Sequence, residues 1–384
     1  MDLCKRFGID FPLFAFSHCR DVVAEVSKAG GLGVLGAIKL SPEQLDAELS
    51  WIDEQVGGRP YGVDLIVPNK MEGRAETPTP AQVLARLPDG HKRFAAALLA
   101  EHGIDAAGID DAVRADSLYM SHNARLAGAD RMLEVAFKHP IALIANALGV
   151  PPASMLEQGK RHGVPVAALV GSKEHALHQV AAGVDLIIAA GAEAGGHCGD
   201  VPSMVLTPEV CEALQDANVP VLSAGGIVTG RQMAAAMAMG AAGVWCGSVW
   251  LTTTEAETPP VVREKMLAAG SRDTVRSRSR TGKHSRQLRS AWTDAWEAPG
   301  APTPLPMPLQ TALVTPYLNQ VDKLASGHHP GARELSTYYV GQGVGLMNRS
   351  LSVRATVQAF REDFLCAYER LQKAVEGPDA EECR

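Results

Sequence analysis

Short apolar segments alternate with amphipathic ones along most of this chain. Continuous apolar segments predict strands that are buried on both faces of a parallel sheet, and the amphipathic stretches between them have helical spacing. Eight such units most simply close into a (β/α)₈ barrel, an α/β fold. An open doubly wound sheet is the structural alternative. The predicted strands are residues 11–15, 32–37, 61–67, 141–148, 164–170, 184–190, 219–224 and 242–247.

The alternation is interrupted once and stops before the chain ends. Residues 70–139 contain helical patterns but no convincing strand, so we expect a helical insertion there. Residues 1–69 and 140–270 are expected to form the barrel, since a barrel commonly occupies about 250 residues. The remaining residues, 271–384, are expected to be a C-terminal extension that packs on or over the barrel.

Composition narrows the class of protein. Hydrophobic residues are 46% of the 384, which is enough for a large core, and the formal charge of −7 argues against nucleic-acid binding through the overall field. No apolar run is long enough to span a membrane, and the N-terminal residues do not resemble a secretory leader. The 7 cysteines form no CxxC pair. Reduced thiols, no metal site and a cytoplasmic location are therefore expected.

Three glycines have the spacing of the dinucleotide-binding fingerprint but not its structural context. Gly31, Gly33 and Gly36 match G-x-G-x-x-G, but a predicted helix precedes them and a strand follows them. The fingerprint requires the opposite order. We interpret these glycines as a helix stop followed by close packing of the strand.

Two glycine-containing turns follow the seventh and eighth predicted strands. The first contains Ser223, Gly225 and Gly226, and the second contains Gly247 and Ser248. In barrels these two loops often bind phosphate, because glycines let backbone N–H groups approach the anion. The alternative is two ordinary turns. Their position on neighbouring strands favours phosphate binding.

The stretch 191–199, Gly-Ala-Glu-Ala-Gly-Gly-His-Cys-Gly, follows the sixth predicted strand. Gly195 and Gly196 would let the chain pass close to a flat ligand, and His197 would then face the barrel mouth. Histidine suits proton transfer near neutral pH. A histidine on a surface loop is the alternative. Glu193 is expected to orient the loop, and Cys198 is expected to be a small packing residue.

Two further features are candidates for ligand contact. Ser17 and His18 end the first strand, so they should face the same mouth, although His18 could equally form a hydrogen bond at a helix N-terminus. A basic run could cover an anionic group such as a nucleotide phosphate, or it could be solvated surface. It consists of Arg276, Arg278, Arg280, Lys283, Arg286 and Arg289.

Several of these segments resemble the nitronate monooxygenase (2-nitropropane dioxygenase-like) flavoproteins. The resemblance lies in residues 184–197, in 223–231 with 240–248, and in the segment 273–289 after the barrel. It implies an FMN-binding barrel with a smaller helical domain over the flavin. The FMN phosphate would lie on Gly225, Gly226, Gly247 and Ser248. His197 would be near the reactive centre of the flavin, as a base or as a hydrogen-bonding group.

Three positions depart from the family pattern. Ala190 stands where many members have glutamine, Asp64 stands where many have asparagine, and Phe14–Ser17 replaces a Pro-Met-Gly type of turn. Polar contacts to the flavin are therefore expected to differ.

The resemblance implies an oxidoreductase that oxidises alkyl nitronates with O₂ to a carbonyl compound and nitrite. An NAD(P)H-dependent reductase of an enoyl thioester or quinone is the alternative, because such flavoproteins share the motifs. A flavin-binding barrel without turnover is a third. A homodimer is compatible with each of them.

Overall fold

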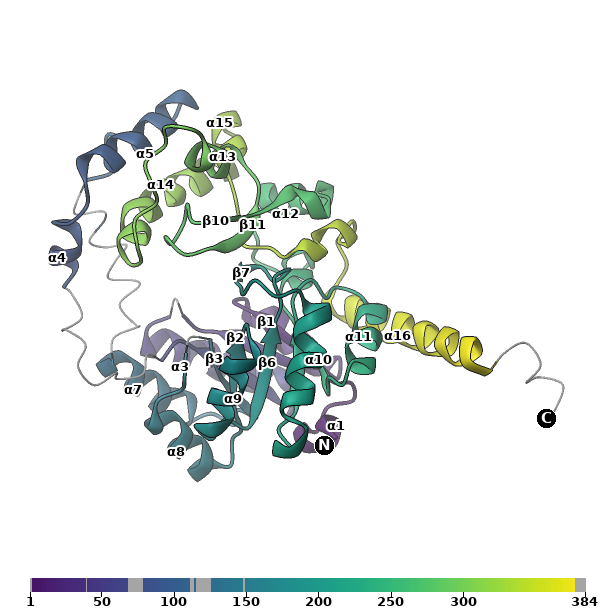
Figure 1. Ribbon diagram of the computed structural model, residues 1–384. Helices are drawn as coiled ribbons and strands as arrows, with labels where there is room; N and C mark the ends of the chain where they lie inside the picture. The colour runs from purple at the N-terminus through teal and green to yellow at the C-terminus, as the bar shows by residue number, and fades with distance from the viewer. Residues whose placement is uncertain are drawn as a thin grey trace.

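Eight parallel strands close into a barrel in the computed structural model, which describes residues 2–38, 40–67, 79–110, 114, 126–147 and 149–376. The predicted (β/α)₈ fold is confirmed, and the strand order around the barrel follows the chain (Figure 1). The strands are β1 (Leu13–Ser17), β2 (Leu32–Gly36), β3 (Tyr61–Leu65), β4 (Leu143–Asn146), β5 (Val166–Val170), β6 (Leu186–Ala190), β8 (Val221–Ala224) and β9 (Gly243–Cys246).

Helices surround the barrel and begin where the sequence provides caps. Ser41 and Thr229 each form a capping box at the start of a helix, which satisfies N–H groups that have no partner inside the helix. The helices around the barrel are α2 (Arg20–Lys28), α3 (Pro42–Val56), α7 (Leu126–Ala136), α8 (Ala153–His162), α9 (Lys173–Ala181), α10 (Ser203–Ala213) and α11 (Gly230–Ala238). The helix after β9, α12 (Pro260–Ala268), lies above the open end of the barrel (Figure 1).

The first two glycines of the G-x-G-x-x-G match serve close packing. A Cβ atom on Gly31 would lie 2.8 Å from the carbonyl oxygen of Leu13, and a Cβ atom on Gly33 would overlap the carbonyl oxygen of Val23. Strand β2 therefore lies directly against α2, which only a glycine at this position permits.

The barrel interior is closed at one end and open at the other. The short helix α1 (Leu3–Phe7) places Leu3 and Phe7 in the same buried cluster as inward-facing strand residues such as Phe14 and Leu143. This helix covers the end at which the strands begin. The C-terminal ends of the strands are the usual place for an active site in such barrels.

A second group of helices lies over the open end of the barrel (Figure 1). Helices from before β4 and after β9 share one apolar core that includes Leu99, Trp292 and Leu313. Described parts of the predicted insertion and the predicted extension thus pack together, whereas α7 packs against α3 on the barrel. The group consists of α4 (Pro80–Leu84), α5 (Asp89–Glu101), α13 (Ala291–Glu297), α14 (Leu309–Ser326) and α15 (Pro330–Leu335).

A small antiparallel sheet lies between the helical group and the barrel (Figure 1). It consists of β7 (Gly196–His197), β10 (Thr274–Ser277) and β11 (Ser285–Leu288). The sequence pattern did not predict these strands, because their residues are polar and the strands are very short. The sheet joins the loop after β6 to a segment that follows the barrel in sequence.

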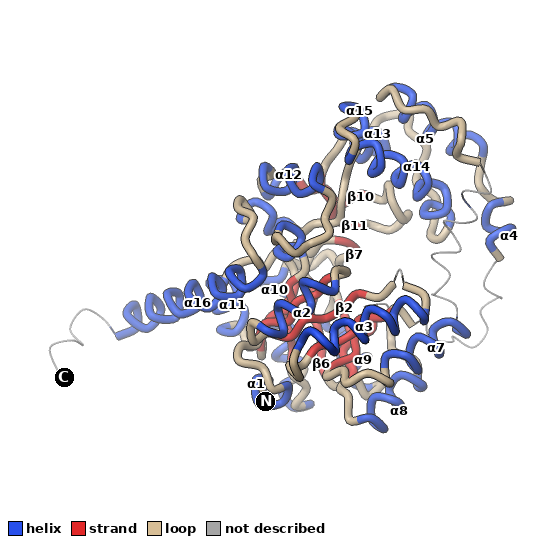
Figure 2. The backbone as a smooth tube through the Cα atoms, turned by 180° about the vertical axis from the view of Figure 1, so that it is seen from behind, coloured by secondary structure: helices blue, strands red, loops and turns tan. Residues whose placement is uncertain are grey.

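The last described helix, α16 (Val353–Glu376), packs on α11 and α2 and then projects from the body (Figures 1 and 2). Gly230 permits the contact, since a Cβ there would overlap the Phe360 carbonyl oxygen, and Arg231 forms an ion pair with Asp363 at 2.6 Å. No helix among the described residues is long and apolar enough to cross a membrane.

Candidate active site

The loop after β6 brings His197 over the open end of the barrel. The chain leaves β6 at Ala190, turns through Gly196 with a φ of +76°, and forms β7. In this strand His197 pairs with Ser285, and Gly196 pairs with Arg286 of β11. His197 is therefore held by an ordered backbone ladder and does not lie on a free surface loop.

The imidazole of His197 is anchored through one nitrogen. Its Nε2 lies 2.8 Å from Oγ1 of the buried Thr281. The Thr281 hydroxyl donates to the carbonyl oxygen of Lys283 at 3.2 Å and accepts from the Lys283 N–H at 3.3 Å. Because that hydroxyl hydrogen is used, we assign the ring proton to Nε2. In this assignment Nδ1 carries a lone pair and has no hydrogen-bond partner within the described residues.

The surroundings of His197 favour its neutral form. His197 is exposed, but the atoms around its ring partly desolvate it and lower its pKa below the usual value, and the positive charge of Lys283 lowers the pKa further. The ring centroid of Tyr339 lies 6.4 Å away, with the guanidinium of Arg280 over that aromatic ring. A neutral imidazole with a free Nδ1 can accept a proton from a bound molecule.

Glu193 fixes the loop that precedes His197, as expected. Its carboxylate accepts hydrogen bonds from the Ser203 N–H at 2.9 Å and from the Ser203 hydroxyl at 2.9 Å. Ser203 is the first residue of α10. The carboxylate thus caps this helix from a distance in sequence, where a negative charge is favourable.

The two turns expected to bind phosphate lie beside each other on β8 and β9. Gly225 and Gly226 have φ values of +107° and +68°, in the region that glycine favours. A Cβ on Gly247 would meet no atom closer than Phe16 Cδ1 at 3.8 Å, so there is space in front of this backbone. Ser248 accepts a hydrogen bond from the Gly341 N–H at 2.8 Å, which leaves the Ser248 hydroxyl hydrogen able to donate to an anion.

Residues 341–343, Gly-Gln-Gly, complete this side of the mouth and were missed in the sequence. The N–H of Gln342 donates to the carbonyl oxygen of Glu193 at 2.9 Å. A Cβ on Gly341 would lie 2.6 Å from that oxygen, and one on Gly343 would lie 2.5 Å from the Gly226 carbonyl oxygen. The only local signal was the glycine spacing, which by itself does not identify the loops that the segment contacts.

The other predicted cofactor residues are in different environments. Gly195 lies against Gly341, and Ala190 is half-buried at the mouth end of β6. Ser223 must be corrected: its hydroxyl is fully buried, 2.7 Å from that of Thr207 on α10. Successive strand residues face opposite sides, so this side chain points away from the barrel interior. Asp64 is buried inside the barrel.

Ser17 and His18 lie at the C-terminal end of β1. The Ser17 hydroxyl accepts from the Cys19 N–H at 3.1 Å, which fixes the turn that leads into α2. Nδ1 of His18 is 2.6 Å from the Gly36 carbonyl oxygen, and the His18 ring packs edge-on against Phe16. His18 therefore holds the ends of β1 and β2 together.

The basic run lies on and around the β10–β11 hairpin, and most of its charges contact other groups of the protein. Arg278 and Arg280 donate to main-chain carbonyl groups, and Arg286 donates to the Ala192 carbonyl oxygen at 3.0 Å. Arg276 pairs with Asp200, and Arg289 pairs with Asp294. Lys283, at the exposed turn beside His197, is the member of the run that faces solvent near the mouth.

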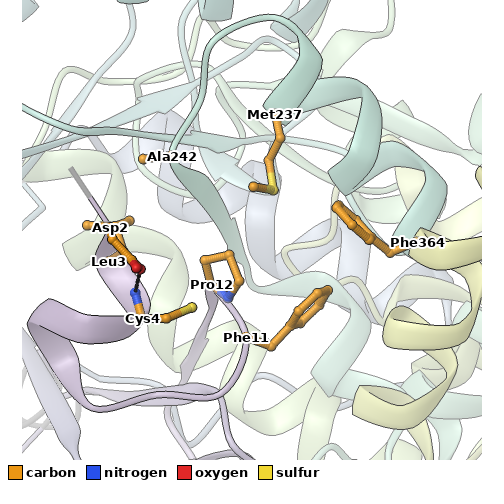
Figure 3. Close-up of a pocket in the computed structure, with 8 residues that line it drawn as sticks. All are labelled: Asp2, Leu3, Cys4, Phe11, Pro12, Met237, Ala242 and Phe364. Atoms are coloured by element: carbon orange, nitrogen blue, oxygen red, sulfur yellow. Dashed lines mark hydrogen bonds between the residues drawn. The ribbon is translucent and has the colours of Figure 1, made fainter. Parts of the chain in front are cut away.

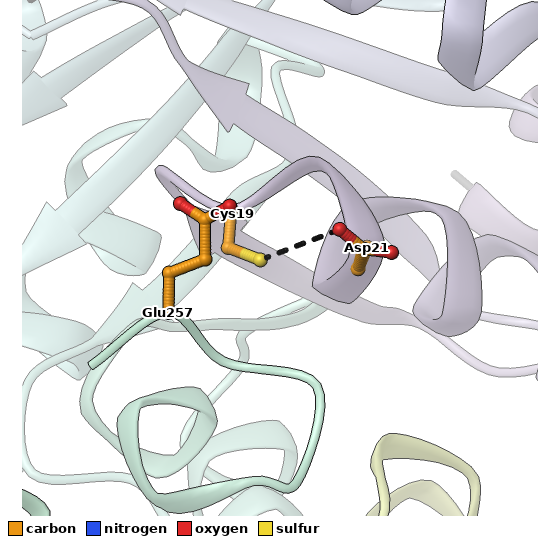
Figure 4. Close-up of side chains that lie close together, drawn as sticks. All are labelled: Cys19, Asp21 and Glu257. Atoms are coloured by element: carbon orange, nitrogen blue, oxygen red, sulfur yellow. Dashed lines mark hydrogen bonds between the residues drawn. The ribbon is translucent and has the colours of Figure 1, made fainter. Parts of the chain in front are cut away.

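The cysteines near these elements are not activated. Burial raises the pKa of Cys198, which supports its interpretation as a packing residue. Cys19, Asp21 and Glu257 have potential ligand atoms within 4.8 Å of one another (Figure 4). However, burial raises the pKa of Cys19, and its thiol donates to the Glu255 carbonyl oxygen at 3.2 Å. A protonated thiol is a poor metal ligand.

A pocket of about 420 Å³ lies at the opposite end of the barrel from His197 (Figure 3). Pro12 and Ala242 immediately precede β1 and β9, so the pocket is at the end where the strands begin. Its walls are mainly apolar. It is lined by Asp2, Leu3, Cys4, Phe11, Pro12, Met237, Ala242 and Phe364.

The sequence matches the family model for nitronate monooxygenase over residues 15–363. The chain belongs to the nitronate monooxygenase family. A protein of Mycobacterium tuberculosis, provisionally named a monooxygenase, is 52% identical over 97% of this chain and 99% of its own length. A provisionally named nitronate monooxygenase of Staphylococcus saprophyticus is 27% identical over 71% of this chain and 73% of its own.

Solved structures agree with this family assignment. Nitroalkane oxidase from Streptomyces ansochromogenes has a TM-score of 0.76 at 25% identity, covering 97% of this chain and all of the other. FabK from Thermotoga maritima has a TM-score of 0.70 at 24% identity, covering 96% and 97% of the two chains, which shows a shared fold. This family member is a flavin-dependent oxidoreductase that acts on a small molecule.

Proposed function

We propose that this protein is an FMN-dependent nitronate monooxygenase that oxidises alkyl nitronates with O₂ to a carbonyl compound and nitrite. The observation that carries the proposal is the position of His197 on β7, after the sixth barrel strand, with Nε2 held 2.8 Å from Thr281 Oγ1 and with no hydrogen-bond partner for Nδ1 among the described residues. The family assignment supports the flavin chemistry.

The residues present fit the phosphate group of FMN. Gly225 and Gly226 have positive φ values in the turn after β8, Gly247 has open space in front of its backbone, and Ser248 offers a hydroxyl hydrogen. Bound FMN would supply the redox chemistry of the reaction, the transfer of electrons from the substrate to O₂. Gly195 and Gly196 would let the loop after β6 lie close to the flat ring, and Ala190 leaves room beside it.

His197 would serve as a general base toward the carbon next to the nitro group. Its Nδ1 would take a proton from a neutral nitroalkane, leaving the nitronate anion and an imidazolium. Both N–H groups of the imidazolium would then be used, Nε2–H toward Thr281 and Nδ1–H toward the anion. A nitronate that is already ionised would need no proton transfer. It would need only the hydrogen bond from Nδ1–H and the positive charge of Lys283 nearby.

A comparison of a neutral nitroalkane with its nitronate anion as substrates tests whether His197 is the general base. The His197→Ala variant should lose about 10²–10⁴-fold in kcat/KM with a nitroalkane, the usual contribution of a general base. It should lose much less with the matching nitronate. His197→Asn is the control, because it fills the site without accepting a proton. Full turnover of both substrates by a flavin-loaded His197→Ala protein would refute the assignment.

The pH dependence follows from the sign of the pKa shift. Only the neutral imidazole can accept a proton, so nitroalkane turnover should fall as pH drops through the pKa of His197. Because partial desolvation and the charge of Lys283 lower that pKa, the acid limb should lie below the ordinary histidine value of about 6.5. A limb above that value in the kcat/KM profile would contradict the assigned environment.

Anaerobic reduction distinguishes this function from the alternatives. Nitronate should bleach the flavin of the purified protein, and NADH or NADPH should not. Bleaching by a nicotinamide alone would indicate the reductase, and a yellow protein inert to all three would indicate a binding module. The basic run gives no support to a phosphate-bearing reductase substrate, because five of its six cations contact groups of the protein itself.

A further inference from the structure

Asp64 is an acidic residue inside the barrel. In β3 the side chains of Tyr61, Val63 and Leu65 belong to the core between the barrel and its helices. Alternation along a strand then turns Gly62 and Asp64 to the barrel interior. Asp64 is the inward residue nearer the C-terminal end of β3, so it lies toward the mouth.

No cationic side chain among the described residues pairs with the carboxyl group of Asp64. The residue is 5% exposed, and its Oδ1 is buried with no hydrogen-bond partner among the described residues. Its register neighbours are Gly36 on β2 and Ala145 on β4. The titratable group on the adjoining β1 end is His18, whose Nδ1 is used by the Gly36 carbonyl oxygen. The polar residue at the end of β4, Asn146, accepts from the Val67 N–H.

Such surroundings oppose ionisation of the carboxyl group. A buried carboxylate without donors is strongly unfavourable, and burial raises the pKa of Asp64 well above its usual value. A neutral carboxylic acid, in contrast, presents one O–H donor and one C=O acceptor. This pair of groups matches an edge of a ligand that offers C=O beside N–H.

We propose that Asp64 is held as a neutral acid and forms a donor–acceptor pair with the C=O and N–H edge of the flavin ring, so that flavin affinity depends on the Asp64 proton. This inference rests on the proposed binding of FMN at the mouth. It accounts for the unpartnered Oδ1, which the ligand would satisfy. It also explains how an acid can stand in a family position that often holds an amide.

The proposal fixes the sign of the pH dependence. Flavin binds to the protonated acid and further stabilises it, so affinity is greatest while Asp64 is neutral. As pH rises above the pKa of the flavin-free protein, Kd should increase by up to tenfold per pH unit. The stability that the neutral acid contributes to folding is lost in the same direction, because the folded-state pKa lies above the unfolded one.

The experiment compares FMN binding by the apo-forms of the wild type and of Asp64→Asn across a pH series, using quenching of flavin fluorescence. Asparagine keeps a donor and an acceptor but cannot lose a proton, so its Kd should lack the alkaline rise. At low pH the two affinities should agree within about threefold, and Asp64→Leu should bind weakly at every pH. Titration of the FMN phosphate and of the histidines affects all variants alike, so it cancels in the comparison.

Infrared difference spectroscopy gives a readout that needs neither turnover nor a variant that binds flavin. The wild type at neutral pH should contain a protonated-carboxyl C=O band that is absent in Asp64→Asn and that shifts when FMN is added. Parallel Kd curves for the wild type and Asp64→Asn would overturn the proposal, and so would a carboxylate band with FMN bound. Absence of flavin binding by the wild type at every pH would overturn the proposed function and the pairing with it, while the band of the apo-protein would still decide the protonation state.

Discussion

The bond between Thr281 and His197 is the contact through which the β10–β11 hairpin controls the proposed base. Replacing Thr281 with valine keeps the size and the branched shape of this buried side chain and removes only the hydroxyl. The bond to Nε2 at 2.8 Å is then lost, and so is the acceptor for the Lys283 N–H. The imidazolium formed during proton transfer would have an unpaired N–H.

The magnitude follows from the value of one hydrogen bond. A net contribution of about 0.5–1.5 kcal/mol corresponds to about a 2- to 13-fold lower kcat/KM with a nitroalkane. The lost acceptor also destabilises the charged ring, so the pKa of His197 should fall and the acid limb of the profile should move to lower pH. Thr281→Ser should restore both quantities, because serine retains the hydroxyl.

The assay is O₂ consumption over a pH series, with nitroalkane and nitronate compared at equal flavin loading. The loss should be larger with the nitroalkane, because only that substrate needs proton removal. If Thr281 had only a structural role, kcat/KM would fall equally for both substrates and the acid limb of the pH profile would not move. Wild-type rates and an unshifted profile in Thr281→Val would refute the reasoning.

Three other changes test neighbouring features. Gly341→Ala places a Cβ 2.6 Å from the Glu193 carbonyl oxygen, so the free energy of unfolding should fall by about 1–3 kcal/mol and FMN should bind more weakly. Urea denaturation and flavin titration measure these two quantities, and unchanged values would mean that the segment moves freely. Lys283→Gln removes a charge that lowers the His197 pKa, so the acid limb should move to higher pH, and a shift in the other direction would contradict the assigned electrostatics. Cys198→Ser should retain turnover, because the raised thiol pKa disfavours a nucleophile; inactivation by this conservative change would show that the sulfur takes part.

The local pattern of apolar residues was sufficient to predict the barrel. Each of the eight strands is a short, mainly apolar run, and a parallel strand that is buried on both faces has such a sequence whatever residues lie elsewhere in the chain. Helix starts such as Ser41 and Thr229 were equally local, because a capping box spans four residues. The strand ends then indicated which loops share the mouth.

Inward and outward positions were harder to assign from the sequence. Ser223 and Ala224 are neighbours at the end of β8, and only strand register decides which one faces the mouth. The glycine-rich context favoured the serine, whereas the structure turns it toward Thr207. A one-residue difference reverses the face of a strand residue, and composition carries no information about it.

The sequence by itself determined an α/β barrel, a histidine after its sixth strand and glycine turns after the next two. The tertiary structure decided what holds that histidine and what completes the mouth. Thr281 is 84 residues from His197, and Gly341 is 93 residues from Ser248. These contacts join polar segments with weak local preferences, so they depend on packing of the whole chain and leave no periodic signal. The protonation state of Asp64 has the same origin, because burial without a partner is a property of the fold.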